Sequence, residues 1–145
     1  MQKAFSRAFE KIDRNMFVEV KITNVGVLDE SGTEGFIEFT AQDGRKIVMG
    51  SFSGEVSYHI IRFMQGDRKS LPTVYNLIEE LANSEGLELE KVEIYARGSV
   101  FRANIYFIGR NGKNLVLENY RASDAVALAT FYNMPIFMDE SLFSQ

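Results

Sequence analysis

The chain has 145 residues, of which 46% are hydrophobic and 25% are charged, and its formal net charge is −4 at pH 7. This length and apolar content predict one globular domain with a real core, and the acidic balance does not favour sequence-independent binding to nucleic acid, although a local basic patch is compatible with it. The absence of cysteine excludes disulfides, thiolate nucleophiles and cysteine-bound zinc. The single histidine, His59, excludes a multi-histidine metal site within one chain.

Residues 4–13 predict a short amphipathic helix, because Phe5, Phe9 and Ile12 fall at helical spacing. This apolar stripe must pack on its own domain or on a second subunit, and we expect a subunit contact. The sequence has no apolar run of about 18 residues and no apolar core of a secretion signal near Met1. It therefore predicts no membrane contact and a cytoplasmic location.

Three strands are predicted next, starting at Phe17 with an alternation of apolar and polar residues and continuing at 36–40 and 46–50. The polar stretch 29–35 predicts a loop between the first two strands. Asp43-Gly44 predicts a two-residue primed hairpin turn between the second and third strands, in which both turn residues have positive φ.

Two helices follow the third strand. Ser53 is the predicted N-cap of the first helix, with Glu55 in the first turn and Gly66 at the end. The second helix follows Pro72 and stops at Gly86. Its predicted apolar face contains Val74, Leu77, Ile78 and Leu81.

Alternation predicts strands again at 92–97, 101–107 and 114–120, joined by a tight turn at Gly98-Ser99 and by a second primed hairpin turn at Asn111-Gly112. The charged run 85–93 is interpreted as solvated charge.

A helix at about 123–132 and a short strand at 135–138 complete the chain. The order α-βββ-αα-βββ-α-β predicts a single α+β domain, with helices packed on a mostly antiparallel or mixed sheet rather than a doubly wound parallel sheet.

The start of the last helix is the first candidate site. Ser123 suits an N-cap, and Asp124 at the first helical position would face the positive end of the helix dipole. Because the helix behind them is apolar nearly all round, we favour capping as the explanation of both residues. Capping does not explain Arg121, which precedes them at the strand end.

The second candidate site lies on the first of the two mid-chain helices. Glu55, His59 and Arg62 are spaced at i, i+4 and i+7, which places a carboxylate, an imidazole and a guanidinium on one stripe. Such groups can move protons and hold a phosphate. The favoured alternative is a solvated helix face with an ordinary i,i+4 pair.

Six segments follow one another along the chain: the hairpin around Asp43-Gly44-Arg45, Met49-Gly50 leading to Glu55, the Leu77 helix ending in Gly86, Gly98-Ser99-Val100-Phe101, Arg121-Ala122-Ser123-Asp124-Ala125-Val126-Ala127-Leu128-Ala129, and Pro135-Ile136. Together they resemble the bifunctional nuclease domain family over about residues 17–142. The chain is accordingly divided into a helical N-terminal extension, residues 1–16, and a bifunctional-nuclease-like domain, residues 17–145.

This resemblance implies a compact α+β domain that forms a homo-oligomer, with a dimer favoured. The family is named for members described as cutting both RNA and DNA. It implies that Glu55, Ser123, Asp124 and Arg121 stand where the family keeps like residues. One departure concerns the family's Thr-His-Asp-Leu at the start of the second mid-chain helix, where this chain has Val74-Tyr75-Asn76-Leu77.

Two functional hypotheses follow. In the first, the chain is a nuclease in which Glu55 and Asp124 are the metal-binding or base carboxylates for Mg²⁺ or Mn²⁺, Arg121 holds the phosphate and His59 assists. In the second, it is a non-catalytic dimeric module that binds a ligand or a protein. The acidic charge and the single histidine favour the second, and the resemblance favours the first.

Overall fold

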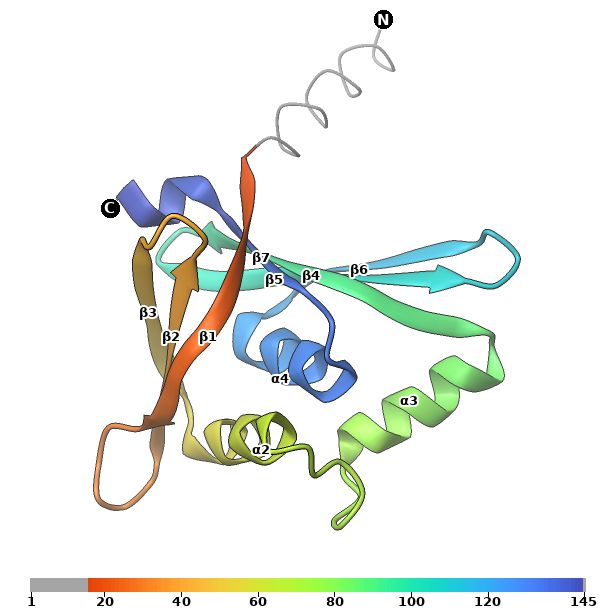
Figure 1. Ribbon diagram of the computed structural model, residues 1–145, viewed down its shortest axis with the longest axis horizontal. Coiled ribbons are helices and arrows are strands. Elements are labelled where there is room, and N and C mark those ends of the chain that lie inside the picture. Colours follow the sequence, from red (N-terminus) through yellow and green to blue (C-terminus); the bar gives the residue numbers. More distant parts are fainter. Residues whose placement is uncertain (1–15, 145) are drawn as a thin grey trace, which may run out of the picture.

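The structure is a computed structural model that describes residues 16–144 (Figure 1). The helix predicted for residues 4–13 lies outside the described residues. The described elements are β1 (Phe17–Val27), β2 (Glu34–Ala41), β3 (Lys46–Ser53), α2 (Gly54–Met64), α3 (Val74–Ser84), β4 (Leu87–Arg97), β5 (Val100–Gly109), β6 (Asn114–Arg121), α4 (Ala122–Tyr132), β7 (Ile136–Asp139) and the 3-10 helix η1 (Glu140–Ser144).

The strands form one curled, mixed sheet in the order β3-β2-β1-β7-β4-β5-β6. The short β7 joins the two antiparallel halves, because it pairs antiparallel with β1 and parallel with β4. Met138 is the partner of Val18 in one pairing and of Ile94 in the other. The predicted α+β class is confirmed, with α2, α3 and α4 on the inner side of the curl (Figure 1).

Helix α4 occupies the centre of the fold (Figure 1). Its small residues Ala125, Ala127 and Ala129 are fully buried, and Phe131 packs edge-on against Phe63 of α2 with 5.2 Å between ring centroids. A helix that is apolar nearly all round is stable only when it is enclosed, so the predicted core position of α4 follows from its composition. Within residues 16–144 no helix has the length and apolarity needed to cross a bilayer.

The predicted hairpins form, but the primed turns predicted at Asp43-Gly44 and at Asn111-Gly112 are wrong. Gly44 and Gly112 have a positive φ, of 94° and 80°, but Asp43 and Asn111 do not. Ala41 bonds across a three-residue loop, with its carbonyl accepting from Gly44 N at 2.9 Å and its N–H donating to the Arg45 carbonyl at 2.8 Å. This is a common alternative to the primed turn, and the Asp43 carboxylate stabilises it by accepting from Arg45 N at 3.0 Å.

The interpretation of residues 85–93 as solvated charge is confirmed for Glu85, Glu88 and Glu90, which are exposed, but it is wrong for Glu93. Most of this run belongs to β4, and Glu93 is only 7% exposed. Glu93 accepts a hydrogen bond of 2.6 Å from the Tyr106 hydroxyl and one of 3.1 Å from Lys91 Nζ. A buried carboxylate is tolerable because its oxygens have these two donors.

Of the apolar face predicted for α3, Ile78 packs inward as predicted, but Val74, Leu77 and Leu81 do not. Tyr75 and Ala82 are buried and Ile78 packs against the core. The exposed fractions are 58% for Val74, 52% for Leu77 and 60% for Leu81. Both faces of α3 carry apolar residues at helical spacing, and the tertiary contacts decided which one was buried.

Candidate functional site

The start of α4 is not capped as predicted. Strand β6 runs directly into the helix, so Arg121 is the last extended residue and the N-cap, and no side chain makes a capping hydrogen bond. Ser123 is buried inside the first turn rather than at the cap, so its predicted capping role is wrong. Asp124 does lie in the first turn, where the helix dipole favours its charge. Its Oδ2 accepts a hydrogen bond of 3.0 Å from Nε of Arg121.

The start of α2 matches the prediction. The Ser53 hydroxyl accepts from Glu55 N at 3.3 Å, which fixes Glu55 in the first turn. The Glu55 side chain is 80% exposed, and its Oε1 lies 3.4 Å from Nε2 of His59. The Glu55 carboxylate is therefore exposed to solvent, and the His59 imidazole contacts it from the protein side.

His59 and Arg62 do not lie on a fully solvated face, because each side chain is only 19% exposed. The His59 ring stacks on Phe63 with 6.0 Å between centroids, and it meets Tyr75 of α3 edge-on at 5.6 Å. The imidazole is thus enclosed by aromatic rings on the side that faces the protein and reaches solvent beside Glu55.

Tyr75 links the two candidate sites. Its side chain is buried, and the burial raises the pKa of Tyr75 to about 12, with further contributions from the negative charges of Asp124 and Glu55. The Arg121 guanidinium acts in the opposite direction. Residues of α2 and of the α4 start therefore lie within electrostatic reach of the same phenol. We call Glu55, His59, Tyr75, Arg121 and Asp124 the Tyr75 cluster.

Sequence reasoning missed Tyr75 as a member of the site. It was noted only as the residue that stands where the family has histidine. The match of Tyr75 to the family's histidine was the signal that could have identified it. Position 75 faces the other candidate residues whichever side chain occupies it.

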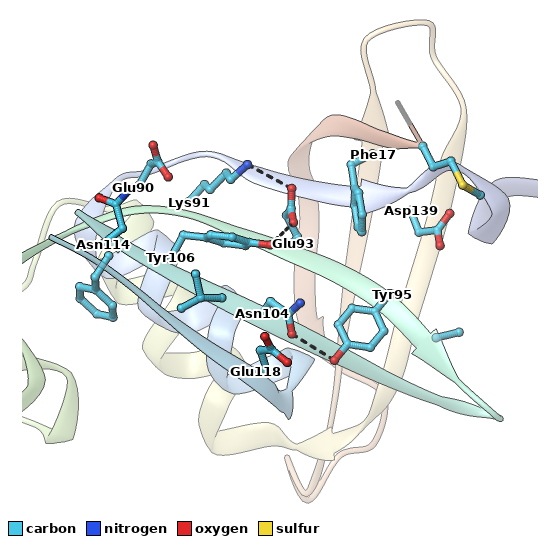
Figure 2. Close-up of a pocket in the computed structure, with 14 residues that line it drawn as sticks. Phe17, Glu90, Lys91, Glu93, Tyr95, Asn104, Tyr106, Asn114, Glu118 and Asp139 are labelled. Atoms are coloured by element: carbon cyan, nitrogen blue, oxygen red, sulfur yellow. Dashed lines mark hydrogen bonds and ion pairs between the residues drawn. The ribbon is translucent and has the colours of Figure 1, made fainter. Parts of the chain in front are cut away.

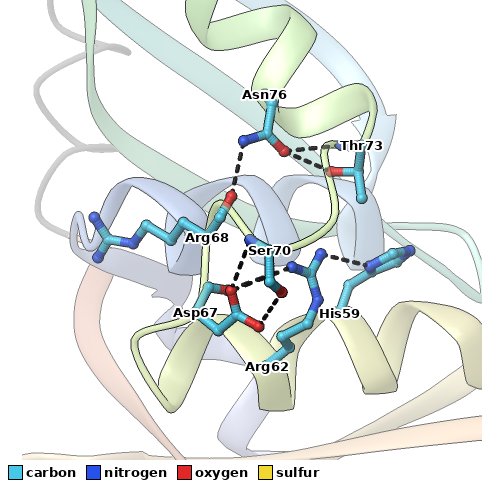
Figure 3. A network of polar contacts seen from close by, with 7 residues as sticks. All are labelled: His59, Arg62, Asp67, Arg68, Ser70, Thr73 and Asn76. Atoms are coloured by element: carbon cyan, nitrogen blue, oxygen red, sulfur yellow. Dashed lines mark hydrogen bonds and ion pairs between the residues drawn. The ribbon is translucent and has the colours of Figure 1, made fainter.

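A polar network holds His59 on its far side (Figure 3). Nη2 of Arg62 lies 3.5 Å from Nδ1 of His59, and because a guanidinium can only donate, Nδ1 is the acceptor. Nη1 of Arg62 donates to the Asp67 carbonyl at 3.5 Å, in the loop between α2 and α3. The same Asp67 accepts hydrogen bonds from the Ser70 hydroxyl and N–H, which lower the pKa of its carboxyl group, with a smaller effect from Arg62.

The network continues from this loop to the start of α3 (Figure 3). Oδ1 of Asn76 accepts from Thr73 N at 2.9 Å, and its Nδ2 donates to the Arg68 carbonyl at 2.8 Å. The amide at position 76 can do both, whereas a carboxylate could only accept. These bonds fix the α2–α3 connection and so the relative positions of His59 and Tyr75.

The cluster can hold an anion and accept a proton. The Arg121 side chain is 69% exposed and its guanidinium presents several donors to solvent, which suits a phosphate. For a metal ion the donors are sparse: in residues 16–144 no three Asp, Glu or His side chains come together in a way that would hold one. Asp124 also has one oxygen engaged by Arg121. These residues do not form a ready metal site.

The chain is an α+β domain of a particular kind. Its mixed sheet curls around the central apolar helix α4, and a charged cluster lies at the start of that helix. Comparison with known families matches the bifunctional nuclease domain over residues 41–145. Because this match spans more than half of the chain, the protein belongs to the bifunctional nuclease domain family. No curated protein matches the chain.

Proposed function

We propose that this chain is a nuclease that hydrolyses phosphodiester bonds of RNA or DNA at the Tyr75 cluster. The observation that supports this most is that Glu55, Asp124 and Arg121 all act electrostatically on the buried Tyr75 phenol while their side chains stay 80%, 42% and 69% exposed. Membership of the bifunctional nuclease domain family supports the same reaction class.

The proposed roles follow from the geometry. Arg121 binds the scissile phosphate, and Asp124 holds the guanidinium in place through its 3.0 Å bond to Nε. Glu55 takes a proton from the attacking water, while His59 at 3.4 Å orients the carboxylate. The water oxygen forms a bond to phosphorus, the ester oxygen leaves with its electron pair, and that oxygen takes a proton from solvent.

No step in this scheme passes through a metal ion. The prediction that Glu55 and Asp124 bind Mg²⁺ or Mn²⁺ stays a prediction. Magnesium commonly binds through one or two carboxylates together with substrate phosphates, so a substrate would have to supply the remaining ligands. Activity measured with Mg²⁺, with Mn²⁺ and with EDTA separates the two schemes.

The experiment is a cleavage assay on labelled single-stranded RNA and DNA with the purified chain. Glu55→Gln should abolish most of the cleavage, since general-base catalysis typically contributes a factor of about 10² to 10⁴. Asp124→Ala should also lower the rate of cleavage, because it removes the acceptor that holds the Arg121 guanidinium. Glu80→Gln is the matched control, because Glu80 is an exposed glutamate on α3 outside the Tyr75 cluster. Circular dichroism checks that each variant is folded. No cleavage by the wild-type chain under any of the metal conditions would refute the nuclease.

The second candidate function is a non-catalytic dimeric module that binds a ligand or a protein. The exposed stripe of Val74, Leu77 and Leu81 on α3 favours a dimer, with a second copy of this chain as the partner. The spacing i, i+3, i+7 matches a helix–helix seam, and the stripe of one copy could pair with that of the other about a two-fold axis.

Light scattering after gel filtration tests the dimer. Leu77→Glu should shift the mass to that of a monomer. Val48→Glu, at a similarly exposed apolar residue on β3, should not. If both variants keep the mass of the wild-type chain, α3 is not the contact.

A further inference from the structure

The outer face of the sheet, opposite the helices, carries a hollow of about 830 Å³ (Figure 2). We call it the outer-sheet hollow. It is lined by Met16, Phe17, Glu90, Lys91, Glu93, Tyr95, Ala96, Asn104, Tyr106, Phe107, Asn114, Val116, Glu118 and Asp139. The outer-sheet hollow shares no residue with the Tyr75 cluster, so what binds in it does not depend on the proposed function.

Hydrogen bonds between its own side chains fix the floor of the hollow (Figure 2). Glu93 is held by Tyr106 at 2.6 Å and by Lys91 at 3.1 Å. The Tyr95 hydroxyl donates to Oδ1 of Asn104 at 3.1 Å. These contacts hold the aromatic rings in fixed positions, so the hollow is a preformed surface that combines aromatic rings with polar and charged groups.

Charge on the rim is predominantly negative. Among the described residues, the one cation in the lining is Lys91, which is paired with Glu93. Glu90, Glu118 and Asp139 remain as further carboxylates around the hollow. A partner that combines apolar side chains with net positive charge is therefore the best match to this surface.

The start of the described chain lies at the rim of the outer-sheet hollow. Met16 and Phe17, the first two described residues, both line the hollow. The Met16 carbonyl accepts a hydrogen bond of 2.5 Å from Glu140 N, which fixes the point from which residues 1–15 depart. From the geometry we infer that residues 1–15 of the same chain dock in the outer-sheet hollow.

The composition of residues 1–15 fits this surface. Phe5, Phe9 and Ile12 form the apolar stripe predicted for residues 4–13, and they meet walls that include Phe17 and Val116. The segment has four basic side chains and two acidic ones: Lys3, Arg7, Lys11 and Arg14 against Glu10 and Asp13. Its net positive charge complements the carboxylates of the rim. A ten-residue helix is about 15 Å long, and residues 14 and 15 are available for the turn that brings it back over the sheet.

Thiol labelling of the full-length chain tests the docking, because the natural sequence has no cysteine. In Val116→Cys the docked segment should shield the thiol, and adding Phe9→Asp should release it and raise the labelling rate by about tenfold. Leu81→Cys, on α3, is the control: its labelling should not respond to Phe9→Asp. Adding Glu118→Lys to Val116→Cys should also raise the rate, whereas Glu80→Lys should not.

A disulfide experiment identifies which chain supplies the segment. In Ala8→Cys with Val116→Cys, mild oxidation should form a disulfide within one chain, and faster than in Ala8→Cys with Leu81→Cys. A disulfide between two chains would show that a second copy fills the hollow and would overturn the inference. Labelling of Val116→Cys that does not respond to Phe9→Asp would overturn it as well.

Discussion

Removing the Tyr106 hydroxyl tests the buried polar pair under the outer-sheet hollow. In Tyr106→Phe the Glu93 carboxylate loses its 2.6 Å donor while it stays 93% buried and keeps only Lys91 at 3.1 Å. Hydrogen bonds to charged groups contribute roughly 1.5–3 kcal/mol, and the orphaned oxygen cannot recover that loss from bulk water. We therefore expect the free energy of unfolding to fall by about 2 kcal/mol.

Urea denaturation followed by circular dichroism measures this difference, and a thermal melt should shift by roughly 4–8 °C for a domain of this size. Tyr95→Phe is the matched control, because its hydroxyl donates to the neutral amide of Asn104 at 3.1 Å in the same hollow. Its expected loss is about 1 kcal/mol or less. If Tyr106→Phe costs no more than Tyr95→Phe, Glu93 does not depend on Tyr106 and the reasoning is refuted.

Three further predictions concern stability. Tyr132→Phe should stabilise the fold by about 1 kcal/mol in urea denaturation, because within residues 16–144 the buried Tyr132 hydroxyl has no hydrogen-bond partner; a loss of stability would contradict this. Thr73→Ala should cost about 1 kcal/mol, since the Thr73 hydroxyl accepts from Tyr75 N at the start of α3, whereas Thr73→Ser should retain most of that stability. As the pH rises from about 10 to 12 the free energy of unfolding should fall, because the unfolded chain loses the Tyr75 proton near pH 10 and the folded chain holds it to about 12. Tyr75→Phe should make this alkaline loss smaller, and an unchanged pH profile would count against the burial of that phenol.

Local sequence signals placed several parts of the fold correctly. Ser53 and Glu55 form the predicted cap and first turn of α2, because capping involves residues two positions apart. Asn133 adopts a left-handed conformation at the end of α4, with φ of 57°, as expected for a helix that stops there. Helix α4 is apolar nearly all round, which predicted that it would be buried, and the structure confirms that prediction.

The errors have a different physical origin. Glu93 accepts its shortest hydrogen bond from Tyr106, thirteen residues later on the neighbouring strand, so no local pattern could reveal that this carboxylate is buried with a hydroxyl donor. In α3 the residues that pack inward differ from the stripe of Val74, Leu77 and Leu81, because two apolar faces competed and only the packing against α4 and β4 decided between them.

The Tyr75 cluster shows both the reach and the limit of sequence reasoning. Glu55, His59, Arg121 and Asp124 were predicted from spacing and from the family resemblance, and the nuclease hypothesis placed them in one joint site. Their approach to one another depends on how α2, α3 and α4 pack, and Tyr75 became visible as the link only in the structure.

The central claim is that the Tyr75 cluster cleaves nucleic acid, and the rate of cleavage of single-stranded RNA by Arg121→Ala tests it most directly. Arg97→Ala, at an exposed arginine on the β4–β5 hairpin outside the cluster, is the reference. Loss of a group that stabilises charge in the transition state typically costs a factor of about 10² to 10³. We predict a loss of that size for Arg121→Ala and wild-type activity for Arg97→Ala, and equal activity of the two folded variants would contradict the claim.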